Sequence, residues 1–522
     1  MLDEVDVLII GSGHSGGMAA KVLTEKGLSC VMLNAGPIVD MRRDTEVRQP
    51  YTLPYRGFKD PKQVPHVFQA NEYNANTWVD EKEVPYTYSA GQPYNWVRVR
   101  LFGGRSLFWS RQSFRLSDYE LKGKSHDGFG EDWPISLADL APYYSRVEKI
   151  FRVEGVPADL PQFPNGDFIA PTEKWGTAMQ HFHDVGAEQG VPVCYQRRSL
   201  GINGLASSIN LLLPDAFETG KLQAIPNVVV REIRVNPKTG RAHEVFFVDR
   251  ISRREMSIKA RVIVLAAGTL ESTRLLLNSK LGNSSGVMGH YLIDQIYGAG
   301  IVCSVPEARD GKAAPGLMGG EGIIPRFRNI NTRASNFLRG YALNVYSSPH
   351  AMDPKNFPAY GRALEEKLAS YNGSGFYLGI MGEVLAHKQH RVSIDPTVTD
   401  AWDIPVLHID TKYTDNEFNM ARDAVDTSSE LAERAGFEVL AKNYDPNPPG
   451  YSIHELGTCR MGDDPKTSVL NKWCQSHDIK NLFVVDGSSF VSSGWQNPTM
   501  TILALSMRAS DYLAEQMRRG EV

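Results

Sequence analysis

The sequence predicts a two-domain α/β protein, with one domain built on a parallel sheet and a second, α+β domain built on an antiparallel sheet. The first observation is a strand–turn–helix–strand pattern within residues 5–33. The second is a series of short β segments, separated by Gly, Pro and Asn, in residues 296–446. The third is the length of 522 residues, which exceeds what one hydrophobic core usually organises. Two domains sharing one ligand are therefore expected.

The N-terminal pattern contains a glycine fingerprint for a dinucleotide. Residues 5–10 are apolar and strand-like, Gly11-Ser-Gly-His-Ser-Gly16 follows at once, and a helix is expected from Gly17 to Lys26. In such a turn the first glycine permits a tight bend, the second lets the backbone approach a pyrophosphate, and the third allows close helix packing. The phosphates then lie at the helix N-terminus. This predicts a Rossmann-like domain whose contacts to the cofactor include Gly11, Gly13, His14, Ser15 and Gly16.

One position departs from the usual dinucleotide pattern. The second strand, residues 29–33, ends at Asn34, where an Asp or Glu usually binds the adenosine ribose. An asparagine amide both accepts and donates hydrogen bonds, so we expect Asn34 to keep the ribose contact without the charge. A turn residue before Gly36 is the alternative interpretation.

Later segments continue the α/β pattern. Residues 227–264 alternate short β runs around a turn at 236–240, and residues 261–268 predict a buried strand that ends on a glycine turn, with a helix at 270–279 behind it. Ser136 and Asp139 are placed as the N-cap and early acid of another helix. Further helices are expected near 360–370 and 415–435.

The C-terminal segment favours a flavin over a nicotinamide. Phe483-Val-Val-Asp486-Gly487 predicts a short strand ending in an acid and a glycine, and Gln496-Asn497-Pro-Thr499 starts a helix with Pro498 in its first turn. A C-terminal strand and helix that return to a nucleotide site formed by the N-terminus are typical of flavoproteins. We therefore expect FAD.

Composition excludes several classes of function. The net charge is −4 and there is no basic run, so the sequence gives no sign of nucleic acid or of an anionic membrane surface as partner. No apolar stretch approaches the about 18–20 residues that span a bilayer. The five scattered cysteines lack metal-binding spacing, and no metal is expected. Acidic residues stand where a signal peptide would be basic, which predicts a cytoplasmic protein, although export with a partner that carries the signal stays open.

Taken together, the motifs resemble the glucose–methanol–choline (GMC) oxidoreductase family. The matching pieces appear in family order and span nearly the whole chain. Within the family, the chain most resembles the pyranose oxidase and bacterial glucoside or gluconate dehydrogenase branch. The pieces are Gly11–Gly16, Gly103-Gly-Arg-Ser106 with Trp109, Ala267-Gly268 with the residues to Leu277, His454 to Gly462, Val485-Asp486-Gly487 and Asn497-Pro-Thr499.

The resemblance assigns roles to individual residues. It implies that His454 is the base that takes the hydroxyl proton while hydride passes to flavin N5, and that Asn497 donates a hydrogen bond to the substrate oxygen. Ser106 and Ser110 are expected near flavin N5. Phe108 stands where some pyranose oxidases carry a histidine tethered to the flavin, so the FAD is expected to be non-covalent. The remaining implied cofactor contacts are Gly103, Gly104, Trp109, Val230, Ala267, Gly268, Asp486, Gly487, Pro498 and Thr499.

The same resemblance predicts how the two domains alternate along the chain. The FAD-binding domain is expected to comprise residues 1–155, 201–295 and 447–522, and the substrate domain residues 156–200 and 296–446.

The expected reaction is oxidation of a secondary ring alcohol, at C3 or C2 of a pyranose or glycoside, with electrons passing to oxygen or another acceptor. Polar substrate-side segments (331–358 and 371–410) favour a polyol. Aromatic-containing stretches at 38–95 and 331–375, with Tyr341 and Tyr346 among their residues, would cover a large substrate, or else form a homo-oligomer or accessory-subunit contact. A non-sugar alcohol, a non-redox lyase and a vestigial flavin fold are the alternatives.

Overall fold

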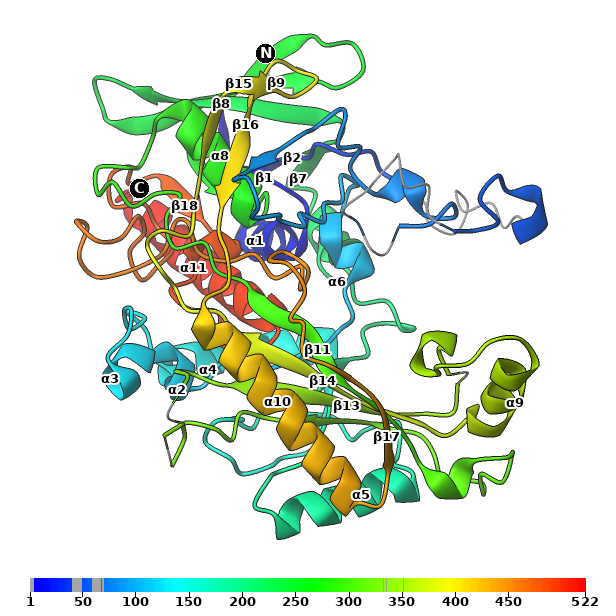
Figure 1. Cartoon of the computed structure of the whole chain (residues 1–522). Coiled ribbons are helices and arrows are strands. Elements are labelled where there is room, and N and C mark those ends of the chain that lie inside the picture. The colour runs from blue at the N-terminus through cyan, green and yellow to red at the C-terminus, as the bar shows by residue number, and fades with distance from the viewer. Residues whose placement is uncertain are drawn as a thin grey trace.

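The computed structural model of the chain describes residues 4–39, 49–58, 67, 70–331, 333–334, 336–350 and 352–522. Two large sheets dominate the molecule, one in its upper half and one in its lower half as seen in Figure 1.

The first sheet has seven strands in the order β7-β2-β1-β10-β9-β8, with β18 paired to β10. Strands β7, β2, β1, β10 and β18 run parallel, whereas β8, β9 and the start of β10 pair antiparallel. Helix α1 (His14–Glu25) contacts β1 and β2, and the central strands of the parallel part are apolar and buried along most of their length. The strands are β1 (Val5–Ile10), β2 (Cys30–Leu33), β7 (Leu222–Ile225), β8 (Val228–Asn236), β9 (Arg241–Asp249), β10 (Glu255–Leu265) and β18 (Leu482–Val484).

Four long helices accompany this sheet. Helix α1 packs on α11, which also packs on α4. Ser136 caps α4 through a reciprocal pair of contacts with Asp139, which confirms the predicted start of that helix. The helices are α1 (His14–Glu25), α4 (Leu137–Phe151), α8 (Thr269–Ser279) and α11 (Thr499–Arg519), with the short α2 (Asp118–Leu121), α3 (Gly123–Asp127), α6 (Ser208–Leu211) and α7 (Leu213–Glu218).

The second sheet has six antiparallel strands in the order β17-β11-β14-β13-β12-β5. Helices α10 (Asp415–Arg434) and α5 (Thr177–Glu188) pack against one face of it, and α9 (Gly361–Tyr371) lies beyond its edge (Figure 1). The strands are β5 (Cys194–Tyr195), β11 (Gln295–Ser304), β12 (Glu321–Ile324), β13 (Tyr341–Ser348), β14 (Gly375–Glu383) and β17 (Glu438–Asn443).

Two small sheets and six 3-10 turns complete the described elements. The small sheets join β15 (Arg391–Thr399), β16 (Pro405–Asp410) and β3 (Thr87–Tyr88), and β4 (Val153–Glu154) with β6 (Arg198–Ser199). The 3-10 turns are η1 (Pro50–Thr52), η2 (Ala75–Thr77), η3 (Gly104–Phe108), η4 (Pro306–Ala308), η5 (Pro354–Asn356) and η6 (Gly487–Ser489).

The predicted fold class is confirmed: a Rossmann-like domain is joined to an α+β domain built on an antiparallel sheet. Two helix starts differ from expectation. Helix α1 begins at His14 rather than Gly17, since Gly13 is its N-cap, and α11 begins at Thr499 with Pro498 as its N-cap. The division of the chain into five domain segments stays a prediction.

One predicted substrate-side residue was wrong. Tyr341 is fully buried, and its hydroxyl donates to Asp423 on α10, so it belongs to the core beneath that helix. Tyr346 lies on the opposite face of the sheet, where its hydroxyl is 3.5 Å from Gln112 Nε2. The reason is the geometry of a strand, in which successive side chains point to opposite faces. Part of the expected covering stretch 38–95 lies outside the described residues.

Candidate active site

The glycine turn after β1 has the shape that a pyrophosphate requires. Gly11 has φ of +109°, and a Cβ there would lie 2.2 Å from the Ala266 carbonyl oxygen. A Cβ on Gly16 would lie 1.9 Å from the Gly11 carbonyl oxygen, so both positions exclude any side chain. A Cβ on Gly13, in contrast, would meet only the Gly103 oxygen at 4.0 Å. Gly13 therefore faces open space at the N-terminus of α1, where backbone amides attract an anion.

Ser12 and Asn34 tie three loops together around this turn. Ser12 Oγ donates to Asn34 Oδ1 at 2.8 Å and accepts from the Gly103 amide at 2.8 Å. Asn34 Nδ2 donates to the Gly36 carbonyl at 3.1 Å. The amide retains one free hydrogen-bonding capacity at each end. Ser12 was missed by the sequence reasoning, although it lies inside the fingerprint.

The loop around η3 connects the nucleotide turn with the C-terminal motif. Gly103 has φ of +99°. Ser106 Oγ donates to the Gly103 carbonyl at 2.6 Å and accepts from the Ser208 amide at 3.0 Å, so this hydroxyl holds the loop. Arg105 donates to Glu455 Oε2 at 2.6 Å, beside His454. Arg105 therefore joins the two loops, and its place within the Gly-Gly-Arg-Ser motif was the signal for it.

Aromatic residues pack beside the loop around η3. His14 packs edge-on against Trp109, with ring centroids 4.8 Å apart, and its Nε2 lies 3.0 Å from the Ala206 carbonyl oxygen. Burial lowers the pKa of His14 to about 4, so this ring is neutral near pH 7. Phe108 is 38% exposed and its ring contacts Trp78. Ser110 is exposed.

The carboxylate of Asp486 accepts hydrogen bonds from several groups of the protein itself. Its carboxylate accepts from the Gly268 amide and Ser272 Oγ on one oxygen, and from the amide and hydroxyl of Ser488 on the other. Burial raises its pKa, which these hydrogen bonds oppose. Asp486 thereby joins β18 to the turn at Ala267 and Gly268, next to Gly487. Val230 lies on β8, two residues beyond the Val228 amide that donates to the Asn34 carbonyl.

His454 and Asn497 lie together at the start of α11. Asn497 Nδ2 is 3.5 Å from His454 Nε2, and Gln295 Oε1 is 2.7 Å from His454 Nδ1. Asn497 Oδ1 is buried, and no described residue bonds to it. Burial, aided by the charge of Arg105, lowers the pKa of His454 to about 3. The half-buried imidazole is thus neutral across the physiological range and able to accept a proton.

One face of the second sheet turns toward the first domain, and Gln295 at the start of β11 connects this sheet to His454. Asn344 Oδ1 accepts from Gln112 Nε2 at 3.0 Å and from Gln196 Nε2 at 3.1 Å. Beside Asn344 on the next strand is Gly379, where an added Cβ would meet no atom within 4 Å. This face therefore combines fixed amides with open space. None of these residues was singled out from the sequence.

The comparisons with known proteins agree with this geometry. The model of the GMC oxidoreductase family matches in two parts, residues 6–297 and 387–506. The chain belongs to the GMC oxidoreductase family. It is therefore an oxidoreductase, and FAD is the expected cofactor.

Several GMC oxidoreductases are similar over nearly the full length. The 2-methyl-1,2-propanediol dehydrogenase of Mycolicibacterium austroafricanum is 27% identical, covering 98% of this chain and 96% of that protein. The fructose dehydrogenase large subunit of Gluconobacter japonicus is 26% identical, covering 99% of each. A C-glycoside 3-oxidase of Arthrobacter globiformis is 23% identical, covering 98% and 95%. The crystal structure of a pyridoxine 4-oxidase from Mesorbium loti shares the fold, with a TM-score of 0.65, 19% identity and 99% coverage of each chain.

Apart from Ser110 and Val230, the predicted site residues of this GMC oxidoreductase lie in two adjoining groups. One surrounds the glycine turn and comprises Gly11, Gly13, His14, Ser15, Gly16, Asn34, Gly103, Gly104, Ser106, Trp109, Ala267, Gly268, Asp486 and Gly487. The other is His454 and Asn497 with Pro498 and Thr499. Helix α11 links the groups, since Ser506 Oγ donates to the Ser15 carbonyl. Their roles toward cofactor and substrate stay predictions.

The described residues show neither a metal centre nor a membrane-spanning helix. Within the described part of the chain, no set of three or more His, Cys, Asp or Glu side chains is grouped to hold a metal ion. No helix among those residues combines the length and apolar character needed to cross a membrane.

Proposed function

We propose that the chain oxidises a secondary ring alcohol, at C3 or C2 of a pyranose or glycoside, to a ketosugar. The observation that carries this proposal is the placement of a neutral imidazole, His454, and an amide, Asn497, beside a sheet face that offers polar groups and room for a ring. Oxygen or another acceptor then receives the electrons.

His454 and Asn497 divide the handling of the substrate hydroxyl. The hydroxyl gives its proton to His454 Nε2, and Asn497 Nδ2 donates a hydrogen bond to the same oxygen as it becomes a carbonyl. Bound FAD supplies the acceptor for the hydrogen and two electrons that leave the carbinol carbon. Asn497 does not titrate, so it can hold the oxygen throughout.

The glycine turn would hold the pyrophosphate of FAD, with Gly13 as the point of closest approach. The N-terminus of α11 would place its amides and positive dipole end toward the flavin. We propose that the FAD is not covalently tethered, because Phe108 stands at the tethering position and offers no nucleophile.

The face of the second sheet that presents Asn344 and Gly379, which we call the inner face, supports a polyol as substrate. Asn344, fixed by two glutamine amides, and Tyr346 are of the kind that orient sugar hydroxyls, while Gly379 leaves space for the ring. A pocket at the same edge of the sheet is lined by Trp175 stacked on Tyr195, with ring centroids 3.9 Å apart. Flat aromatic faces of this kind bind sugars and aglycones. The fructose dehydrogenase and C-glycoside 3-oxidase named above agree with this substrate class.

A small non-sugar alcohol is the second candidate, because a relative of similar identity is a dehydrogenase of 2-methyl-1,2-propanediol. The two candidates differ in what reduces the flavin. We would mix the enzyme anaerobically with monosaccharides, glycosides and short diols, follow flavin bleaching, and locate the product carbonyl by NMR.

A ketone at C3 or C2 of a sugar is the expected result. Recovery of only a lactone or aldonic acid would place the chemistry at C1, and bleaching by diols alone would favour the second candidate. If no alcohol bleached the flavin, a non-redox activity would be favoured. Acid precipitation of the same sample tests the cofactor attachment, and yellow colour retained on the precipitate would contradict a non-covalent FAD.

A further inference from the structure

Gln295 is a fully buried residue of the second sheet whose side chain contacts the imidazole of His454. It is the first residue of β11, with no exposed surface. Its Oε1 lies 2.7 Å from His454 Nδ1. Its Nε2 lies 2.7 Å from the Gly494 carbonyl oxygen and 2.9 Å from the Gln496 carbonyl oxygen.

These contacts determine which way the Gln295 amide faces. Both hydrogens on Nε2 are donated to main-chain carbonyl oxygens, which can only accept. Turning the amide over would place Oε1 against two acceptors and leave two buried carbonyls unpaired, which is unfavourable because each loses its only donor from Gln295. Oε1 must therefore face His454, and the nitrogen that it contacts must donate.

The consequence concerns the proton on the imidazole. A neutral histidine carries its proton on one ring nitrogen, and the hydrogen bond made by one nitrogen decides the state of the other. We propose that Gln295 holds His454 in the tautomer protonated at Nδ1, so that the lone pair of Nε2 faces the substrate beside Asn497. The Asn497 amide agrees, because its Nδ2 approaches Nε2, which then accepts. This inference rests on the proposed role of His454 as the base.

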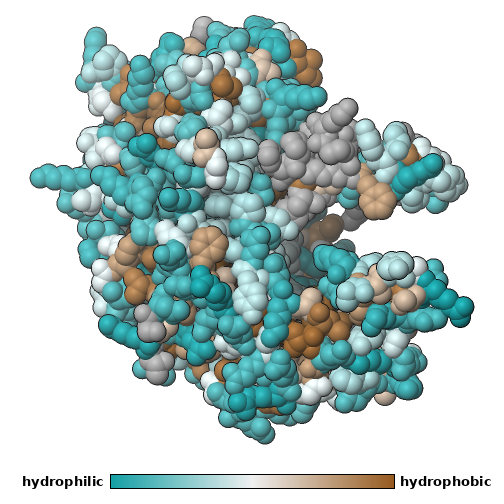
Figure 2. Space-filling view, viewed as in Figure 1, coloured by the Kyte–Doolittle hydropathy of each residue, from teal (hydrophilic) through white to brown (hydrophobic). Residues whose placement is uncertain are grey.

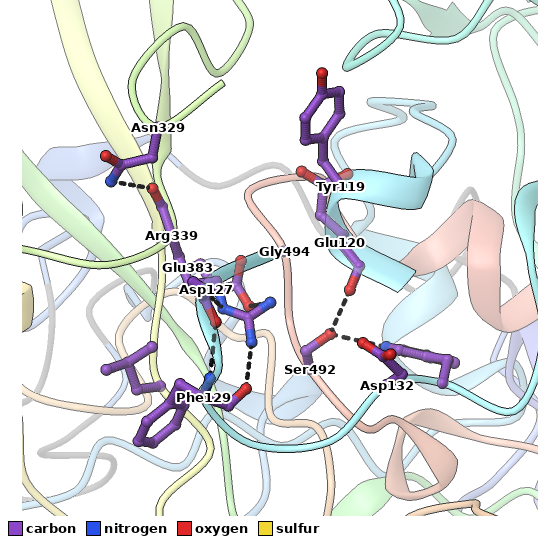
Figure 3. A network of polar contacts seen from close by, with 12 residues as sticks. Tyr119, Glu120, Asp127, Phe129, Asp132, Asn329, Arg339, Glu383, Ser492 and Gly494 are labelled. Atoms are coloured by element: carbon purple, nitrogen blue, oxygen red, sulfur yellow. Dashed lines mark hydrogen bonds and ion pairs between the residues drawn. The ribbon is translucent and has the colours of Figure 1, made fainter. Parts of the chain in front are cut away.

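The carbonyls that orient Gln295 are themselves held by a buried network. The side chain of Gln496 donates to Glu120 Oε2 at 3.0 Å, and Glu120 also accepts from the amide and hydroxyl of Ser117. Ser492, in the same loop, donates to the main-chain carbonyl of Glu120, as Figure 3 shows. The loop 492–497 is thus fixed from both sides, which keeps its carbonyls in place for Gln295.

Charged groups from both predicted domains pair around this network. Arg326 Nη1 lies 3.6 Å from Glu120 Oε1, and Arg339 pairs with Asp127 at 2.8 Å. Figure 3 shows Arg339 between Asp127, Phe129 and Glu383. Glu383 is the cross-strand neighbour of Gln295, and burial raises its pKa to about 7. The tautomer-setting contact is therefore part of the boundary between the two domains.

Ring-nitrogen NMR tests the tautomer directly and requires no substrate. Protein labelled with ¹⁵N in its histidine rings would be examined as the holoenzyme, with the His454→Ala variant identifying the signals of His454. We expect a protonated Nδ1 and an unprotonated Nε2. A proton on Nε2 in the wild-type holoenzyme would overturn the proposal, whatever the substrate proves to be.

Two substitutions at Gln295 distinguish a role in positioning the proton of His454 from a purely structural role. Gln295→Met keeps the length but removes the acceptor, so the His454 signals should show a mixture of tautomers. Flavin reduction should slow by about tenfold or more, but by no more than the ~10²–10⁴ that a general base contributes, while half-saturation by substrate changes little. Gln295→Glu keeps an acceptor at Nδ1, and its second oxygen can bond to the Gly494 or Gln496 carbonyl only as a protonated carboxyl. The single His454 tautomer should therefore persist in this variant, in contrast to Gln295→Met.

The matched control is Gln475→Met, the same change at a buried glutamine that bonds to Asn471 and Lys480 far along the C-terminal loop. It should alter neither the rate nor the His454 signals. Wild-type rate and tautomer in Gln295→Met would refute the proposal. Failure of every alcohol to reduce the wild-type flavin would instead refute the proposed function and leave the NMR result standing.

Discussion

The two faces of the six-stranded sheet are made by the same strands but differ in nearly every property. The face beneath α10 and α5 presents Leu343, Val345 and Ile380, all fully buried with Met420 and Phe182 from the helices. The opposite face presents Asn344, Tyr346 and Gly379, held by amides or open to space. Successive residues of one strand thus alternate between a packed core and the face that we propose binds the substrate, so stability and substrate binding should be separable by mutation.

The surface of the molecule is hollowed on one side. Figure 2 shows a hollow between the lobe that carries α9 and the projecting segment that includes η1. Tyr51 and Phe58 in that segment are 71% and 74% exposed. Their role as a cover for substrate or as a contact with another subunit stays a prediction.

The largest expected effect comes from the base beside the inner face. His454→Ala should slow flavin reduction by roughly 10²–10⁴, the usual contribution of a general base. Asn497→Ala should lose less, because a hydrogen bond and not the proton acceptor is removed. Stopped-flow absorbance measures both rates, and FAD content serves as the control for folding. A His454→Ala enzyme that reduces its flavin at the wild-type rate would contradict the assignment of the base.

Gly379 tests the open part of the inner face. Gly379→Val suits a strand and adds volume only to the empty space, so the fold should persist. Half-saturation by glycosides should rise on the order of 10–200-fold, as expected for added methyl groups in a binding pocket, while a three-carbon diol is little affected. Gly300→Ala is the matched contrast, because its Cβ would lie 2.2 Å from the Leu378 carbonyl oxygen and should destabilise the sheet instead. Equal changes for glycosides and diols would argue against a substrate site at Gly379.

Leu343→Ala tests the face of the six-stranded sheet that packs beneath α10 and α5. Removal of this fully buried side chain should lower the free energy of unfolding by ~2–5 kcal/mol, by lost burial and a residual cavity. Thermal unfolding of the holoenzyme checks the loss. The rate of flavin reduction per folded molecule should stay at the wild-type value. A changed substrate preference would contradict the proposal that stability and substrate binding depend on different faces of the sheet.

The smallest expected effect is on the pH dependence. Because burial and Arg105 lower the pKa of His454 to about 3, the ring is neutral above that pH and loses its base function only as the pH falls through it. Flavin reduction should therefore be flat between pH 5 and 8 when measured immediately after a pH jump. An acidic limb near pH 6.5, the ordinary pKa of histidine, would show that the ring is solvated in the working enzyme.

The sequence predicted the features that depend on neighbours along the chain. The strand at residues 5–10, the turn from Gly11 to Gly16 and the cap at Ser136 each follow from short-range sterics or hydrogen bonding. The hairpin at 236–240 and the helices near 360–370 and 415–435 were found for the same reason. Membership in the GMC family was recognised because such motifs recur in order.

The remainder of the site depends on contacts between distant segments. Gln295 touches a residue 159 positions away, and Gln112 bonds to one 232 positions away. Neither glutamine lies in a motif, and an isolated glutamine has no pattern that distinguishes a buried clamp from a surface residue. Tyr341 was misplaced for a related reason, since its face was decided by the packing of α10.

The strand order of the first sheet has a consequence for how the protein is made. Val5 of β1 pairs with Ala260 of β10, and Ile263 of β10 pairs with Leu482 of β18. A nascent chain therefore carries its first strand without its central partner for some 250 residues of synthesis, and domains with such distant pairings fold slowly. Until β10 is made, one edge of β1 lacks its partner strand, and unpaired strand edges of this kind favour aggregation. The residues proposed to face the flavin span this order, from the glycine turn at Gly11 to Thr499 at the start of α11, so the proposed site is complete only after both segments have been made.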